Sequence, residues 1–356
     1  MQILSVRGAL PEHRYTQEEI TDAFAGVIAQ GAMDERLMRR LHANAGVRQR
    51  HLAMPLEEYG RLEGFGQSND RFIGVAVRLG AQAVVDALKA ADLTPADVDL
   101  IVSTTVTGLA VSSLEARIAP MIGLRPDVKR VPLVGLGCVA GAAGVARLHD
   151  YLVGHPDGVA VLVSAELCSL TVQRDDVSVP NLVASGLFGD GAAAVVAVGS
   201  SRDPQGPGQV QVLGSRSRLY PDSERTMGWD VTSTGLRIVL DANVPELVRH
   251  YVGSDVDAFL ADARLRREDI EWWVCHPGGP KVLEAIEDAL DLSRSAVEMT
   301  WDSLARIGNL SSASVLHVFE DTLRDRPPRP GSYGMLLAMG PGFCSELVLL
   351  RAPAAR

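Results

Sequence analysis

Long apolar runs, separated by segments of helical pattern, dominate the middle of the chain. The stretches 159–163 and 192–198 consist only of Val, Ala and Leu. An uninterrupted run of this kind is typical of a strand that is buried on both faces. Residues 78–91 instead place apolar side chains at helical spacing, which predicts an amphipathic helix. Alternation of such strands and helices predicts an α/β protein whose sheets are covered by helices.

One pattern occurs twice. Residues 91–104 and 263–276 each read as the end of a helix, a polar turn and an apolar strand. The repeat predicts two related halves, each with its own sheet; a chance similarity between two helix–turn–strand units is the alternative. The stretch 200–208, rich in Pro, Gly and polar residues, predicts a surface loop between the halves. We therefore divide the chain into 1–200 and 201–356.

The composition excludes several classes of function. The 356 residues carry a net charge of −10, unlike the basic surfaces that bind nucleic acid or anionic membranes. The four cysteines include no CxxC pair, which predicts reduced thiols and no metal site. No segment has the pattern of a signal peptide or the length of a membrane span. The sequence therefore predicts a cytoplasmic protein without membrane insertion.

Cys138 stands where a chain would place a nucleophile. It follows an apolar stretch at 131–137, which predicts a strand, and precedes 139–148, where small residues predict a closely packed helix. The helix dipole and the free N–H groups at a helix start favour a thiolate, and the flanking glycines allow a tight turn. This is the cysteine counterpart of the strand–nucleophile–helix turn of serine hydrolases. A buried structural cysteine is the alternative.

Three further segments carry candidate residues in the second half. His276 ends an apolar strand and is followed by a Pro/Gly turn and a predicted helix at 281–290. Asn309 lies in a Gly-Asn loop ahead of a predicted helix at 315–323, where its commonest role is an N-cap. A Gly-Pro-Gly-Phe turn occupies 340–343. Each segment taken alone has an ordinary structural explanation.

Together these segments resemble the condensing enzymes of the thiolase type, and most closely the type III polyketide synthases of the chalcone synthase-like family. The resemblance covers nearly the whole chain and implies a thiolase-like duplicated αβαβα layered fold with two related halves. The first half carries the cysteine, and the second carries the histidine and the asparagine. The motifs are Gly-Cys-Val-Ala-Gly at 137–141, Leu-Phe-Gly-Asp-Gly-Ala-Ala-Ala at 187–194, His-Pro-Gly-Gly-Pro at 276–280, Gly-Asn-Leu-Ser-Ser-Ala-Ser at 308–314 and Gly-Pro-Gly-Phe at 340–343.

The resemblance implies a role for each motif. Cys138 would take a starter acyl group from coenzyme A as a thioester. His276 would hold the thiolate as an ion pair and, with Asn309, would donate hydrogen bonds to the developing oxyanions. Phe188 would be the gatekeeper between the pantetheine tunnel and the cavity, with plain core packing as the alternative. Decarboxylation of a malonyl thioester supplies the carbon nucleophile, so neither a metal nor an organic cofactor is implied.

Residues that bind the substrates also follow from the resemblance. Arg40 matches a position that contacts the phosphates of coenzyme A, which suits a guanidinium group. Arg36 and Arg39 are secondary candidates, and a solvated charged face is the alternative. Gly278 and Gly279 would lie beside the pantetheine arm. The acyl pocket is expected to be lined by Val106, Thr107, Cys168, Thr171, Trp229, Ile238 and Ser311.

Two pocket positions bear on the size of the starter. Ile238 falls where plant members carry an aromatic gate, which predicts a pocket open to longer aliphatic chains. Trp229 replaces the glycine of plant members, and the opposite possibility is that it closes the pocket. The segment 227–231 resembles bacterial members that make alkylpyrones and alkylresorcinols from fatty acyl starters.

The sequence as a whole predicts a homodimeric bacterial type III polyketide synthase. It would load an acyl-CoA starter, extend it with malonyl-CoA, and release a cyclised alkylpyrone, alkylresorcinol or related phenol. The nearest enzyme alternative is an initiating ketoacyl-carrier-protein synthase, which uses the same Cys/His/Asn trio. A non-catalytic acyl-CoA-binding protein of the same fold is the other alternative.

Overall fold

A mixed β-sheet runs through the molecule. The computed structural model describes residues 1–28, 34–202 and 210–353, and within them nine strands form one sheet in the order β11-β12-β13-β8-β1-β7-β6-β4-β5. These strands are β1 (Gln2–Ala9), β4 (Leu100–Thr105), β5 (Lys129–Val134), β6 (Val159–Leu167), β7 (Asp190–Val198), β8 (Val210–Leu219), β11 (Ile270–Cys275), β12 (Tyr333–Gly340) and β13 (Cys344–Arg351). Two separate pairs are formed by β2 (His13–Thr16) with β3 (Gln49–Leu52) and by β9 (Met227–Thr232) with β10 (Gly235–Leu240).

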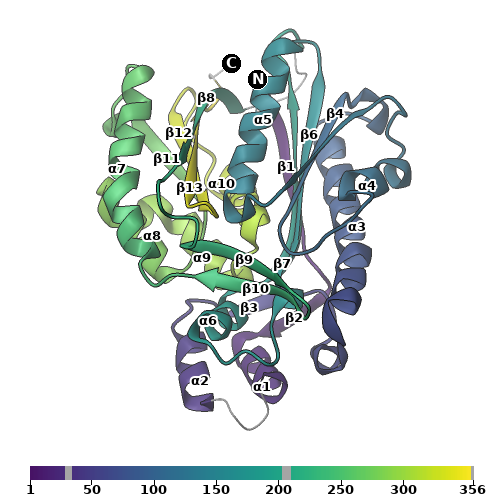
Figure 1. Cartoon of the computed structure of the whole chain (residues 1–356). Helices are drawn as coiled ribbons and strands as arrows, with labels where there is room; N and C mark the ends of the chain where they lie inside the picture. Colours follow the sequence, from purple (N-terminus) through teal and green to yellow (C-terminus); the bar gives the residue numbers. More distant parts are fainter. Residues whose placement is uncertain (29–33, 203–209, 354–356) are drawn as a thin grey trace.

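Helices cover the outer faces of the sheet and fill the space between its two halves. Figure 1 shows α3 and α4 along one side, α5 and α10 in the middle, and α7 and α8 along the other side. The helices predicted at 78–91, 281–290 and 315–323 correspond to parts of α3, α8 and α10. The helices are α1 (Gln17–Val27), α2 (Glu35–Ala43), α3 (Gly64–Ala90), α4 (Leu114–Ile122), α5 (Ala140–Gly154), α6 (Val179–Leu187), α7 (Val244–Asp262), α8 (Pro280–Leu290), α9 (Glu298–Ile307) and α10 (Ser314–Asp325).

The order and the direction of the strands repeat. The series β1, β7, β6, β4 contains two antiparallel pairs and then a parallel pair, and the series β8, β13, β12, β11 does the same. The turns before β4 and β11 also match, because Asp97 accepts a hydrogen bond from the backbone of Thr94 and Asp269 accepts one from that of Arg266. The prediction of two related halves is confirmed. The prediction that each half has its own separate sheet is wrong, because β1 pairs with β8 and joins the strands of both halves into one sheet.

The apolar runs are explained by burial on both sides of the sheet. On β6, Val161 and Val163 belong to the core that includes α3, whereas Ala160 and Leu162 belong to the core that includes α5 and α10. Successive side chains of a strand point to opposite faces, so both alternating sets are apolar. The layers therefore follow the order helix, strands, helix, strands, helix that the resemblance implies, with the strands of the two halves joined in one sheet.

Small residues allow the start of α5 to approach its neighbours closely. A Cβ atom at Gly141 would lie 2.3 Å from the carbonyl oxygen of Ser312, and one at Gly144 would lie 2.5 Å from Leu162. Both separations are far inside van der Waals contact, so these positions require glycine. The first contact brings α5 of the first half against the segment that leads into α10 of the second half.

The predicted boundaries around Cys138 need one correction. The strand expected at 131–137 ends at Val134, and the helix expected from residue 139 is preceded by a 3₁₀ turn, η3 (Gly137–Val139). Gly135 and Gly137 have φ angles of +96° and +56°, a conformation that glycine adopts without steric cost. These two glycines turn the chain out of β5, so the strand cannot extend to Cys138.

One end of the sheet is covered by α1, α2, α6, the β2–β3 pair and the β9–β10 hairpin (Figure 1).

None of the described helices is long and apolar enough to cross a membrane. The described ranges also contain no group of three or more His, Cys, Asp or Glu side chains placed to hold a metal ion. Residues 203–208 of the predicted loop lie outside the described residues, and the division predicted at residue 200 falls between β7 and β8.

Candidate active site

Cys138, His276 and Asn309 meet at one cavity between the two halves. Cys138 lies in η3 ahead of α5, Asn309 lies ahead of α10, and His276 directly follows β11. The cavity contains about 650 Å³ of space free of protein atoms, part of it open to solvent. Its walls are formed by Val106, Gly137, Cys138, Leu187, Phe188, Met227, Gly228, Trp229, Ile238, Leu240, Val244, His276, Gly278, Val282, Asn309, Ser311, Met339, Pro341 and Phe343.

The Cys138 thiol is buried and paired with a hydroxyl. Its Sγ donates to Oγ of Ser311 at 3.6 Å. Burial raises the pKa of the thiol to about 12, and the contact with Ser311 opposes this shift only in part. The turn is held by Pro341 of the Gly-Pro-Gly-Phe motif, because a Cβ at Gly137 would lie 2.7 Å from Pro341 Cδ. The motif therefore packs directly against the turn that presents the thiol.

The His276 imidazole is buried without a partner. Its backbone N–H donates to the carbonyl of Leu337 at 2.9 Å, which continues the pairing of β11 with β12 beyond the strand end. Neither ring nitrogen has a hydrogen-bond partner among the described residues. Burial lowers the pKa of His276 to about 3, so the ring is neutral near pH 7. An unpartnered buried polar group is costly, and its presence in a cavity indicates a group kept ready for a ligand.

Asn309 is fixed at both its backbone and its side chain. Its N–H donates to the carbonyl of Leu187 at 3.0 Å, and its own carbonyl accepts from the N–H of Gly189 at 2.9 Å. Its Oδ1 accepts from the N–H of Ser311 at 2.8 Å. The carboxamide oxygen therefore closes a local turn, while the NH₂ group remains to donate. The N-cap alternative is wrong, because the N-cap residue of α10 is Ala313. The same contacts place Phe188, which forms a bridge with Asn309, at the cavity wall.

The β9–β10 hairpin supplies one wall of the cavity. Trp229 lies directly opposite Ile238 across the two strands, and Met227 lies opposite Leu240. All four residues line the cavity. The two residues that give opposite expectations about starter length are therefore neighbours in one wall.

The structure does not bring three of the predicted pocket residues to the cavity wall. Thr107 is buried, where its hydroxyl donates to Glu166 at 2.7 Å and accepts from the N–H of Leu167 at 2.9 Å. Cys168 is buried, and the hydroxyl of Thr171 donates to its carbonyl at 2.7 Å. Cys168 and Thr171 belong to a 3₁₀ turn, η4 (Cys168–Thr171), behind the wall. The other predicted pocket residues, Val106, Trp229, Ile238 and Ser311, do line the cavity.

The predicted coenzyme A contacts lie in different surroundings. Arg40 is on the exposed face of α2 and has no carboxylate partner among the described residues, whereas Arg39 pairs with Asp22 and Glu35. Gly278 lines the cavity. Gly279 is the N-cap residue of α8 and has φ +123°. This backbone conformation by itself explains why the residue is glycine.

Sequence reasoning missed a buried carboxylate beside the site. Glu166 ends the long apolar run of β6 and accepts hydrogen bonds from Ser312 Oγ at 2.5 Å and from the N–H of Val106 at 3.0 Å. Burial raises its pKa, although four hydrogen-bond donors oppose the shift. Glu166 therefore holds in place the backbone of Val106, which lines the cavity, and the side chain of Ser312, which follows Ser311 in the chain. A lone Glu in an otherwise apolar strand was the signal available in the sequence.

The cavity thus combines a thiol, an unpartnered imidazole and a carboxamide donor with walls that are otherwise largely apolar. A thiol beside a base forms covalent acyl intermediates, and fixed donors stabilise the oxyanions of acyl transfer. The arrangement is that of a cysteine-dependent acyltransferase.

Comparison with known proteins identifies the family. Profiles of the chalcone and stilbene synthases match the chain at 1–203 for the N-terminal domain and at 211–353 for the C-terminal domain. The chain belongs to this family, and it is a type III polyketide synthase. The expected class is therefore confirmed, and the initiating ketoacyl-carrier-protein synthase is not supported.

Relatives and solved structures agree with this assignment. A 1,3,6,8-tetrahydroxynaphthalene synthase of Streptomyces peucetius subsp. caesius is 54% identical over 349 residues, covering 98% of this chain and 92% of that protein. The synthase of the same name from Streptomyces griseus is 32% identical over 96% of this chain and 90% of that protein. The crystal structure of the 1,3,6,8-tetrahydroxynaphthalene synthase of Streptomyces coelicolor A3(2), a bacterial type III polyketide synthase, matches with a TM-score of 0.92 at 30% identity and covers 100% of both chains.

We expect His276→Ala to make Cys138 less reactive near neutral pH. Burial is the main cause that raises the pKa of the thiol to about 12, and we expect an imidazole that takes up the thiol proton to favour the thiolate. The rate of alkylation of Cys138 by iodoacetamide at neutral pH should fall at least about tenfold, and the pH of half-maximal rate should rise. Peptide mass spectrometry after short exposures over a range of pH measures both quantities.

Half-buried Cys344 is the internal control, because it does not line the cavity that His276 and Cys138 share. Burial and Glu346 raise its pKa to about 11. Its alkylation should be the same in both proteins. If the alkylation rate of Cys138 and its dependence on pH are unchanged in His276→Ala, the imidazole does not act on the thiol.

Proposed function

We propose that this type III polyketide synthase builds its product on Cys138 by decarboxylative condensation. The observation that carries the proposal is the convergence of thiol, imidazole and carboxamide in one cavity. As the sulfur attacks the thioester carbonyl of an acyl-CoA starter, the thiol passes its proton to His276, whose neutral ring can accept it. Coenzyme A leaves with that proton as a free thiol, and the starter remains as a thioester on Cys138.

The extension step forms the carbon–carbon bond. Malonyl-CoA loses CO₂, and the electron pair of the broken bond forms the enolate of acetyl-CoA. The enolate carbon attacks the acyl thioester, the sulfur of Cys138 departs, and the lengthened chain remains on coenzyme A. Asn309 Nδ2 and His276 donate to the enolate oxygen, and such donors are most effective in a site that excludes water. Since these protein groups carry the charge, the proposed step uses no metal or organic cofactor.

We propose that the substrates approach past Phe188. This residue lines the cavity at the end of α6, and Gly278 lines it at the start of the turn before α8. A Cβ at Gly278 would lie 3.0 Å from Val282, so this wall has little room for a side chain, and we propose that the pantetheine arm lies beside it. Arg40, exposed on α2 and free of an ion pair within the described ranges, is available for the phosphates of coenzyme A.

Two classes of cyclised product are supported by different observations. Ile238 in the cavity wall favours aliphatic starters and hence alkylpyrones or alkylresorcinols. The relative that is 54% identical is a 1,3,6,8-tetrahydroxynaphthalene synthase, which favours a phenol of that kind. Trp229, opposite Ile238, favours the second class, because its large side chain narrows the cavity that a long acyl chain would have to enter.

The first prediction of this proposal is that Ile238→Phe selectively impairs long starters. Extra atoms in a packed pocket cost about 1–3 kcal/mol, so kcat/KM for lauroyl-CoA should fall about tenfold to a hundredfold. Acetyl-CoA should be nearly unaffected. Mass spectrometry of the products formed from malonyl-CoA alone and with acetyl, hexanoyl and lauroyl starters measures both selectivity and product class. A wild type that makes tetrahydroxynaphthalene from malonyl-CoA alone, and turns over no long starter, would refute the alkyl class.

The second prediction separates the roles of the two donors. Asn309→Ala should slow decarboxylation of malonyl-CoA by about a hundredfold to a thousandfold, because an oxyanion donor is lost. Formation of the acyl adduct on Cys138 should change much less, since His276 remains to take up the thiol proton. Radiolabelled CO₂ release and intact-protein mass measure the two steps. Loss of loading with intact decarboxylation would show that the roles are assigned wrongly.

We also propose that the protein is a homodimer in which a second copy covers β5. This edge strand exposes apolar residues, with Val134 at 59% and Val131 at 40%, and nearby Met121 at 59% and Val111 at 100%. An exposed apolar edge strand is a site for pairing with another chain. Light scattering should give twice the 38.0 kDa of one chain, and Val134→Asp should weaken the dimer. A monomeric wild type would refute the proposal.

A further inference from the structure

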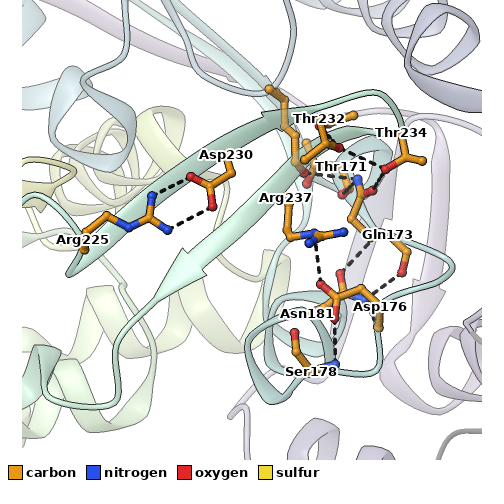
Figure 2. A network of polar contacts seen from close by, with 12 residues as sticks. Thr171, Gln173, Asp176, Ser178, Asn181, Arg225, Asp230, Thr232, Thr234 and Arg237 are labelled. Carbon is orange, nitrogen blue, oxygen red and sulfur yellow. Dashed lines mark hydrogen bonds and ion pairs between the residues drawn. The ribbon is translucent and has the colours of Figure 1, made fainter.

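The β9–β10 hairpin is a separate part of the cavity wall. It carries Trp229 and Ile238 but does not pair with the nine-stranded sheet. Its position is therefore set by packing of β10 against α3, α6 and η4 and by polar side-chain contacts near its two ends (Figure 2). Any residue that holds the hairpin also determines the width of the cavity.

Gln173 ties the hairpin tip to the segment behind the wall. Its side chain is 6% exposed. Its Nε2 donates to the carbonyl of Thr171 at 3.0 Å and to that of Leu236 at 3.3 Å, while its Oε1 accepts from Thr234 Oγ1 at 2.7 Å. One amide thus connects Thr171 of η4 to Thr234, in the turn between β9 and β10, as Figure 2 shows. It also connects η4 to Leu236 of β10.

Gln173 is itself held in place by α6. Its backbone N–H donates to Asn181 Oδ1 at 3.2 Å, and Asn181 Nδ2 donates to the carbonyls of Gln173 at 2.8 Å and Asp176 at 2.6 Å. The tip fits closely around the amide, because Gly235 has φ +135° and a Cβ there would lie 3.1 Å from Gln173 Nε2. The amide is therefore a rigid link from α6 to the hairpin.

Other polar contacts of the hairpin are weaker anchors. Arg225 pairs with Asp230 at 2.6 and 3.0 Å, and Arg237 pairs with Asp176 at 3.7 Å. The arginines are more than half exposed, and exposed ion pairs contribute little to stability. The buried amide hydrogen bonds of Gln173 are the stronger constraint, since breaking them leaves buried groups unsatisfied.

The tip also has space into which it can move. A cleft separate from the active-site cavity is lined by Val172, Gln173, Thr234 and Arg237, among others. It contains about 990 Å³ of space free of protein atoms, part of it open to solvent. The cleft leaves space beside the tip, so we expect that release of the amide lets the hairpin shift.

We propose that Gln173 is a positioning residue for starter selectivity. By holding the hairpin against η4, it fixes the distance of Trp229 and Ile238 from the opposite wall and so sets which acyl chains fit. The inference rests on the proposed function, because it concerns the selectivity of the same cavity.

Two variants test the proposal, and each breaks the link from one side. Gln173→Leu removes the amide, and Thr234→Val removes the hydroxyl that donates to it at an exposed position where folding is not at risk. Both should change the ratio of kcat/KM for lauroyl-CoA to that for acetyl-CoA by about fivefold or more. The double variant should show no larger change than Gln173→Leu alone. Decarboxylation of malonyl-CoA should remain within about twofold of wild type, because Cys138, His276 and Asn309 are not on the hairpin.

Ser233→Ala is the matched control, since this exposed neighbour lies in the same turn. Hydrogen exchange of the amides of residues 227–240 should speed up at least about tenfold in both test variants and not in the control. An unchanged selectivity ratio in folded Thr234→Val, or independent effects of the two substitutions, would overturn the proposal. Absence of condensation in the wild type would instead overturn the proposed function, and unchanged hydrogen exchange would refute the link whatever the activity.

Discussion

The start of α5 lies directly against the segment that leads into α10, and the site depends on this contact. Gly141 has no room for a Cβ, because the carbonyl oxygen of Ser312 lies 2.3 Å from where it would be. The same approach brings the Cys138 thiol to Ser311 at 3.6 Å. Since equivalent helices of two related halves meet here, one half supplies the nucleophile and the other supplies its donors. Close packing also removes water, which raises the pKa of the thiol and lowers that of His276.

Much of this arrangement follows from patterns in the sequence. Apolar runs predicted strands buried on both faces, and they are confirmed because residues on both sides of β6 are in a core. The repeated turn predicted two halves, which the strand order confirms. Glycines around Cys138, and the strand-terminal position of His276, indicated residues that the fold brings to one cavity. These predictions hold because turn geometry and burial are determined largely by the residues of short segments.

Other features depend on which way a side chain turns, and spacing along the chain does not fix that. Thr107 and Thr171 were expected in the acyl pocket, yet their hydroxyls are used by Glu166 and by the backbone of Cys168. The pairing of the thiol with Ser311, instead of His276, likewise arises only from tertiary packing. The link through Gln173 joins segments about sixty residues apart. The chemistry was therefore more predictable than the shape of the pocket around it.

The most direct test of a single condensing centre is the mass of the intact protein after incubation with an acyl-CoA starter. The wild type is expected to gain the mass of one acyl group, and Cys138→Ala is expected to gain none. The buried thiols of Cys168 and Cys275 are present in both proteins, so they serve as built-in controls. An acyl adduct that persists in Cys138→Ala would contradict the assignment of Cys138 as the nucleophile.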